Sequence, residues 1–135
     1  MAAPFALTFF RGEAQRLRWQ MDPNPLGGVV GWTLQFTMRK KLDKNIEVVI
    51  KTTTDGGIEV IDGPGGTADI ILTSADTAAF KLDAVDDKGL PVLDDRGFQV
   101  GIWQADVQRI DAGHENVASI GTITLEHPVR NFPAP

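Results

Sequence analysis

The chain has 135 residues, of which 42% are hydrophobic and 23% charged, and its 13 basic and 18 acidic side chains give a formal net charge of -5. This composition is typical of a globular chain and not of a disordered one. The negative charge disfavours nucleic acid as a partner, because nucleic acid needs a basic face, and the absence of cysteine excludes disulfides and thiolate metal sites.

The N-terminal residues, Met1 to Phe10, lack the basic residues that begin a signal peptide, and their apolar run stops at Arg11. Nowhere in the sequence do about 18 apolar residues follow one another. We therefore expect no signal peptide, no membrane span and no membrane partner.

Alternating apolar and polar residues predict strands in the first part of the chain, because successive side chains of a strand point to opposite faces. The alternation runs through residues 17–21 and, after a turn-rich segment, through residues 32–38. It predicts two strands that each have one buried face. Together with a later strand at 68–72, they are expected to point seven side chains inward: Leu17, Trp19, Trp32, Leu34, Phe36, Ile70 and Leu72.

Glycine-rich turns separate the next short strands. Apolar residues at 46–50 lead into Asp55-Gly56-Gly57, a strong hairpin signal, and the chain continues through residues 58–61. The turn Gly63-Pro-Gly-Gly66 precedes the strand at 68–72. These runs predict a β-meander of three short strands.

One short segment, Ser74–Phe80, is a helical candidate, with Thr73 or Ser74 as its cap and Asp76 in the first turn. It is too short for a long amphipathic face, so we expect a single turn that crosses the end of a sheet. The acidic stretch 83–96 then predicts an exposed loop.

Beyond this loop, the apolar residues alternate from Phe98 to Ile102, and the apolar phase then passes to Trp103. A slip of one residue is typical of a β-bulge, and Gly101 lies where the bulge would form. A closing strand is predicted at 117–125.

Seven or eight short strands separated by turns predict an all-β fold, an antiparallel β-sandwich with at most one short helical turn. We expect a single domain over residues 1–135, with terminal arms at about 1–5 and 128–135. No internal repeat of fixed period is visible.

The sequence predicts no catalytic residue, no cofactor and no metal site, and hence no enzyme. His114 lies in a polar turn and His127 at a strand end, without the spacing of metal ligands. The aspartates from Asp83 to Asp95 could offer oxygen ligands to calcium, but the DxDxDG spacing is absent and a solvated loop is favoured. Three tryptophans fall in or beside apolar strand phases and are expected in the core rather than on a sugar-stacking platform: Trp19, Trp32 and Trp103.

The order of the motifs resembles the Ig-like domain at the N-terminus of phage baseplate upper proteins, and related small domains of tail-fibre proteins. The resemblance covers about residues 5 to 126. Its motifs, followed by a closing pair of strands, are Phe10-Arg-Gly-Glu13, Gln15-Arg-Leu-Arg-Trp19, Gly31-Trp-Thr-Leu-Gln-Phe-Thr-Met-Arg39, Gly56-Gly57-Ile58 and Leu72-Thr-Ser-Ala-Asp-Thr77.

The resemblance implies an Ig-like antiparallel β-sandwich and a non-enzymatic structural role in the virion of a tailed bacteriophage, assembled in the host bacterial cytoplasm. The domain would attach to neighbouring subunits of the tail, baseplate or fibre. Its expected partners are other virion structural proteins and copies of itself. Two alternatives stay open: a capsid decoration protein, and a free-standing carbohydrate- or protein-binding β-sandwich.

The terminal arms are the expected assembly contacts. Both combine prolines, which cannot donate to a strand ladder, with isolated apolar side chains, and the candidate interface residues are Phe5, Val129 and Phe132. A neighbour's groove could bury such a side chain. The alternative is that Phe5 begins the first strand and Phe132 folds back over its own sandwich.

Overall fold

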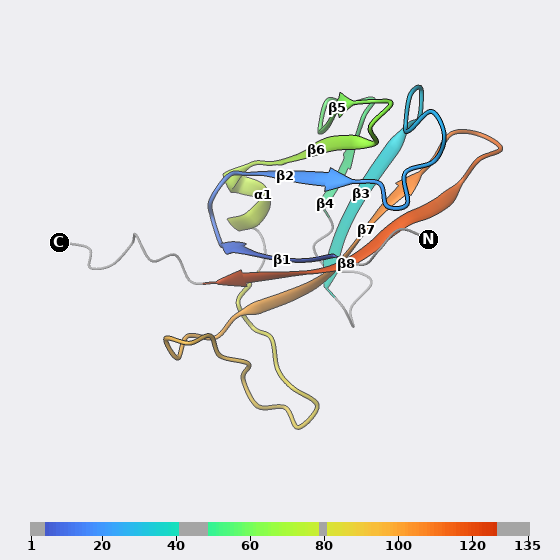
Figure 1. The fold of residues 1–135 in the computed structure, drawn as a ribbon. Helices are drawn as coiled ribbons and strands as arrows, with labels where there is room; N and C mark the ends of the chain where they lie inside the picture. Colours follow the sequence, from blue (N-terminus) through green and yellow to red (C-terminus); the bar gives the residue numbers. More distant parts are fainter. Residues whose placement is uncertain (1–4, 41–48, 79–80, 127–135) are drawn as a thin grey trace.

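The structure is a computed structural model that describes residues 5–40, 49–78 and 81–126. In these ranges, eight strands and one short helix follow one another along the chain (Figure 1). They are β1 (Phe5–Phe10), β2 (Gln15–Gln20), β3 (Leu34–Lys40), β4 (Val49–Thr52), β5 (Ile58–Asp62), β6 (Thr67–Leu72), α1 (Ser74–Ala78), β7 (Gly101–Arg109) and β8 (Asn116–Glu126).

The strands form two sheets that enclose one core. The five-stranded sheet has the order β1-β8-β7-β3-β4, and the three-stranded sheet has the order β2-β6-β5. Apart from β1, this order is that of an immunoglobulin sandwich, in which strands G, F, C and C′ form one sheet and B, E and D the other; the first strand of that sandwich lies beside B, whereas β1 lies beside β8. The expected all-β sandwich of seven or eight strands with one short helical turn is confirmed.

One pairing differs from the expected antiparallel pattern. β1 pairs with β8 in parallel, in a register that runs from Phe5 opposite Gly121 to Phe10 opposite Glu126. Most of the chain separates the two strands, so no hairpin forces them to run in opposite directions. After β1, the Arg11 amide still donates to the carbonyl of Glu126 at 2.9 Å before the chain crosses to β2 in the other sheet.

The turn at Asp55-Gly56-Gly57 does not form the expected hairpin. β4 pairs with β3, and β5 pairs with β6, so this turn carries the chain from one sheet to the other. The Asp55 Oδ1 atom accepts hydrogen bonds from the amides of Thr52 at 3.2 Å and Gly57 at 2.7 Å. These contacts fix the local reversal, but they do not determine which strands pair. Of the expected meander, only β5 and β6 are hairpin neighbours.

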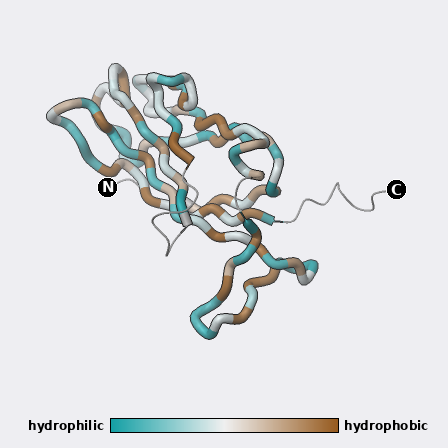
Figure 2. Tube along the Cα trace, turned by 180° about the vertical axis from the view of Figure 1, so that it is seen from behind, coloured by the Kyte–Doolittle hydropathy of each residue, from teal (hydrophilic) through white to brown (hydrophobic). Residues whose placement is uncertain are grey.

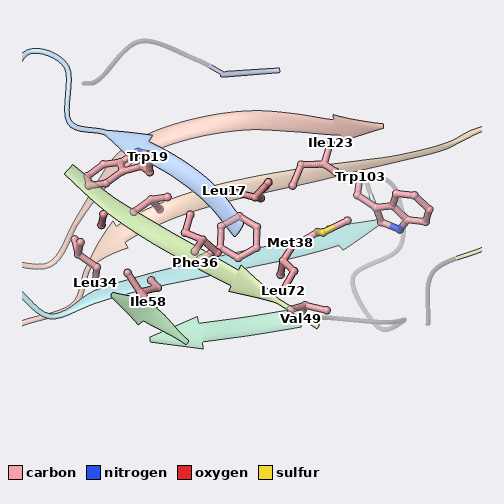
Figure 3. Packing of buried hydrophobic residues seen from close by; sticks show 14 of the residues in the cluster. Leu17, Trp19, Leu34, Phe36, Met38, Val49, Ile58, Leu72, Trp103 and Ile123 are labelled. Atoms are coloured by element: carbon pink, nitrogen blue, oxygen red, sulfur yellow. The ribbon is translucent and has the colours of Figure 1, made fainter. Parts of the chain in front are cut away.

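The core lies between the facing surfaces of the two sheets. Of the seven side chains expected to point inward, Trp32 is only partly buried. It packs against the core, and the Arg109 guanidinium lies 4.3 Å from its ring centre. Figure 3 shows Leu17 and Leu72 from one sheet meeting Phe36 and Ile123 from the other. The other six side chains expected to point inward are at most 9% exposed: Leu17, Trp19, Leu34, Phe36, Ile70 and Leu72.

Two of the three tryptophans, Trp19 and Trp103, lie in the core. Trp19 is 6% exposed, and its indole Nε1 donates to the Ser119 hydroxyl of the opposite sheet at 3.1 Å. Trp103 is 1% exposed. Burial of these two rings leaves no row of exposed indoles on which a sugar could stack.

Gly101 has a different role from the one expected. It is the first residue of β7, and the shift in the β7–β8 register lies between Val107 and Gln108. A Cβ atom at Gly101 would lie 1.9 Å from a ring carbon of Trp103, so glycine is required there by close packing. The expected bulge at Gly101 is therefore wrong. The apparent slip of phase arises because Val100, which is 4% exposed, precedes the strand.

The helix is one turn long, as expected, although residues 79 and 80 of the predicted segment lie outside the described residues. Its cap is Thr73, because the Asp76 amide donates to the Thr73 hydroxyl at 3.1 Å. The Asp76 carboxylate accepts from the Thr73 amide at 2.7 Å in return. Lys51 of β4 pairs with Asp76 at 2.7 Å and so ties the turn to the edge of the five-stranded sheet.

We predict that Leu34→Ala or Phe36→Ala lowers the free energy of unfolding by about 2 to 5 kcal/mol, through lost transfer energy and the cavity left behind. Both side chains are 0% exposed. Urea denaturation followed by tryptophan fluorescence measures the change. Ile50→Ala is the matched control, because Ile50 lies on β4 and is 51% exposed. Unchanged midpoints for both core variants would contradict the inward assignment.

Candidate interaction surfaces

Of the predicted interface residues, only Phe5 falls in the part of the chain that the structure describes. It begins β1 opposite Gly121, as in the alternative in which Phe5 opens the first strand. Val129 and Phe132 lie outside the described residues, as does His127. The assembly role of the three interface residues stays a prediction. His114 is exposed in the turn between β7 and β8.

The acidic segment between α1 and β7 is an ordered projection, here named the twin-turn arm (residues 81–100). It leaves the sandwich at the start of β7 and extends away from both sheets (Figures 1 and 2). Two isolated bridges, Val85 with Pro91 and Leu93 with Gln99, mark two consecutive hairpins. The expected exposed loop is therefore a pair of defined turns.

The two turns have the same hydrogen bonds at a spacing of eight residues. In the first, the Gly89 amide donates to the Asp86 carbonyl at 3.0 Å, and the Asp86 amide donates to the Leu90 carbonyl at 2.8 Å. In the second turn, the Gly97 amide donates to the Asp94 carbonyl at 3.0 Å, and the Asp94 amide donates to the Phe98 carbonyl at 2.8 Å. Gly89 and Gly97 have φ of 80° and 86°, the conformation that such a three-residue loop requires of its glycine.

The arm is an internal repeat that the sequence reading missed. The repeated units are Ala84-Val-Asp-Asp-Lys-Gly-Leu-Pro91 and Val92-Leu-Asp-Asp-Arg-Gly-Phe-Gln99. The signal was present in the sequence as Asp-Asp-(Lys or Arg)-Gly with an apolar residue on either side. Each unit has eight residues and is therefore much shorter than the repeats that form solenoids and propellers.

A closed ring of three backbone hydrogen bonds fixes the base of the arm. The Ala84 amide donates to Val100, the Val92 amide to Ala84 and the Val100 amide to Val92, at 2.9, 2.9 and 3.0 Å. These residues occupy the same position of successive units. The ring joins both turns to Val100, the residue that precedes β7, so the sandwich determines where the arm projects.

The aspartates of the arm build its turns. The Asp86 Oδ1 atom accepts from the amides of Lys88 and Leu90, both at 2.9 Å. The Asp94 carboxylate likewise accepts from the amides of Arg96 and Phe98, and it also pairs with the Arg96 side chain at 2.9 Å. Burial acts to raise the pKa of Asp94, but these hydrogen bonds outweigh it and lower the pKa. Among the described residues, no three potential metal ligands gather in one place.

We predict that EDTA leaves the melting temperature of the chain unchanged, because Asp86 and Asp94 already use their Oδ1 oxygens to accept backbone amides. Differential scanning fluorimetry before and after dialysis against EDTA tests this. Adding calcium afterwards is the control. A fall of several degrees that calcium reverses would instead support calcium binding by Asp83 to Asp95.

Four apolar side chains of the arm are exposed to solvent. Arg96 pairs with Asp94 and lies 5.2 Å from the ring centre of Phe98, whereas Lys88 makes no ion pair within the described part of the chain. The arm therefore presents exposed apolar side chains together with Lys88, a cation that has no ion-pair partner in the described part of the chain. The exposed apolar residues are Val85 (57%), Leu90 (59%), Leu93 (55%) and Phe98 (37%).

A groove of about 440 Å³ opens between the two sheets beside β1 and β2. Within the described residues each of these strands pairs on one side only, β1 with β8 and β2 with β6. Leu7 and Trp19 line the groove, and Gln20 and Asn24 form part of its rim, where they donate to backbone carbonyls of the turn at 63–66. The groove thus offers an apolar floor between two strand edges.

An ionic cluster covers the outer face of the three-stranded sheet. Asp69 of β6, whose side chain is 4% exposed, accepts hydrogen bonds from Arg16 at 2.7 Å and from Arg18. Arg16 also pairs with Glu59 of β5. The hydrogen bonds from Arg18 and then Arg16 lower the pKa of Asp69. The cluster links all three strands of this sheet, and this link accounts for the buried charge of Asp69.

The lowered pKa of Asp69 predicts a pH-dependent contribution to stability. It is present above the unfolded carboxyl pKa of about 3.9 and is lost as the pH falls through the folded value. Asp69→Asn should therefore melt at a lower temperature than the wild type at pH 7, with the difference narrowing below about pH 4. Melting curves between these conditions measure it. A difference that does not depend on pH would mean that the charge of Asp69 contributes nothing.

No protein-family model matches this chain, and no curated protein matches its sequence. No helix among the described residues is long and apolar enough to cross a membrane.

Proposed function

We propose that this chain is a non-enzymatic attachment domain in the virion of a tailed bacteriophage, where it binds neighbouring subunits of the tail, baseplate or fibre. The motifs from Phe10-Arg-Gly-Glu13 to Leu72-Thr-Ser-Ala-Asp-Thr77 support the phage assignment by resemblance. The observation that carries the attachment role is the twin-turn arm, a built projection with exposed apolar side chains.

The arm has the properties of a binding element. The arm exposes four apolar side chains, and exposed apolar side chains are typical of protein–protein contact sites. The backbone of the arm is fixed by the Asp86 and Asp94 turns and by the ring at Ala84, Val92 and Val100. Binding through it therefore orders little additional backbone, so less of the interaction energy is lost to conformational entropy.

A second candidate, a ligand-binding β-sandwich, is favoured by the groove between β1 and β2. Its volume of about 440 Å³ lies within the range of small-molecule sites. Its floor is apolar, and Arg18, Gln20 and Asp22 lie among its lining residues. The same groove lies beside two strand edges, which suit an extended peptide equally well.

The proposed function predicts that the chain is present in purified phage particles at a fixed ratio to the other structural proteins. Quantitative mass spectrometry of gradient-purified particles tests this. The double variant Leu90→Ser with Leu93→Ser should remain folded and lose at least about tenfold in occupancy, because it removes two exposed apolar contacts.

The matched control is Val60→Ser with Ile61→Ser. These residues are 38% and 43% exposed and lie on β5 of the three-stranded sheet, outside the arm. It should leave occupancy unchanged. Purified particles that lack the wild-type chain would contradict the virion role. Wild-type occupancy of the arm variant would contradict attachment through the arm.

A further inference from the structure

The outer face of the five-stranded sheet contains a recess of about 250 Å³. The register places a row of four residues across four strands of this face, from Ile50 of β4 through Thr37 of β3 and Asp106 of β7 to Ile120 of β8, and all but Ile50 line the recess. Side chains at such directly paired positions are neighbours on one face. The recess is lined by Thr37, Arg39, Gln104, Ala105, Asp106, Val117 and Ile120.

Asp106 has a carboxylate oxygen that no group in the described part of the chain satisfies. Its Oδ2 atom accepts from the Gln108 side chain at 3.3 Å, but its Oδ1 atom is buried and has no hydrogen-bond partner among the described residues. Arg39 lines the same recess, but in the described structure it forms no ion pair with Asp106. Buried polar atoms are normally hydrogen-bonded, so Asp106 retains an unused acceptor that a donor from a partner would satisfy once the carboxylate turns outward.

Part of the border of the recess is apolar and exposed, and the rest is polar, at Arg39 and Gln104. Val117 is 39% exposed, Ile120 is 44% exposed, and Ile50 at the other end of the row is 51% exposed. The surface therefore combines a central acceptor with apolar side chains around it. A complementary partner presents a basic side chain next to apolar ones.

The twin-turn arm presents this combination. Lys88 lies in the first turn between Val85 and Leu90, which are 57% and 59% exposed. Five other basic residues are already paired with carboxylates: Arg16, Arg18, Lys51, Arg96 and Arg109.

We propose that the chain associates head to tail with copies of itself, the arm of one copy docking on the outer-face recess of the next so that Lys88 donates to Asp106. Leu90 then covers part of the apolar border at Val117 and Ile120. This inference rests on the proposed function and identifies a partner for the arm.

The contact joins different surfaces of the two copies. Asp106 lies about 16 Å along β7 from Gly101, where the arm of the same chain leaves the sandwich. The arm points away from the sheets (Figure 1), so it docks on another copy rather than on its own recess. Each copy gives one arm and receives one, and such a heterologous contact builds a ring when its rotation closes and a filament when it does not.

The test is the self-association of the purified full chain, followed by sedimentation velocity up to about 0.5 mM, since small interfaces are weak. The wild type should associate as its concentration rises. Lys88→Glu and Asp106→Lys should each weaken association at least about tenfold, because each places like charges opposite one another. An equimolar mixture of the two variants should associate again, since each mixed contact then joins opposite charges.

Lys81→Glu is the matched control, because it makes the same charge change at an exposed lysine outside the contact. Asp106→Asn replaces Asp106→Lys if circular dichroism shows that the latter unfolds, and it should also weaken association. A wild type that stays monomeric throughout, or single variants that associate like the wild type, would overturn the inference. If the wild-type chain is nevertheless present in particles, the proposed function stands and the arm binds another virion protein.

Discussion

All surface features of this protein depend on the packing of two sheets against each other through side chains that water does not reach. Leu34, Phe36 and Trp103 of the larger sheet belong to one buried cluster with Trp19 and Leu72 of the smaller one, and all are at most 6% exposed. Close packing of this kind tolerates little displacement. The strand edges, the arm and the outer faces are therefore held at fixed positions relative to one another.

Polar contacts add specificity to this apolar packing. The indole of Trp19 crosses from one sheet to the other to reach Ser119, which is 1% exposed. On the outer face of the smaller sheet, Asp69 is satisfied by two arginines. Asp106 of the larger sheet contrasts with both, since burial raises its pKa while one of its oxygens has no partner among the described residues.

The twin-turn arm shows how a short sequence can build a rigid projection without a core of its own. Each unit uses one aspartate to bind the amides of its turn and one glycine to reverse the chain. The apolar side chains are thereby left in solvent instead of collapsing onto the sandwich. Such a module can change its contact residues without changing its backbone, which suits an attachment role.

The sequence by itself determined the fold class, the inward side chains of β2, β3 and β6 and the capped turn of α1, because alternation, turn glycines and capping act over a few residues. It did not determine that Asp55-Gly56-Gly57 crosses between sheets, that β1 pairs with β8 in parallel, or that Gly101 makes room for Trp103. The recess at Asp106 was equally out of reach, because it brings together residues from β3, β7 and β8. These features depend on which distant strands become neighbours, and only the tertiary structure decides that, through the burial of the whole core.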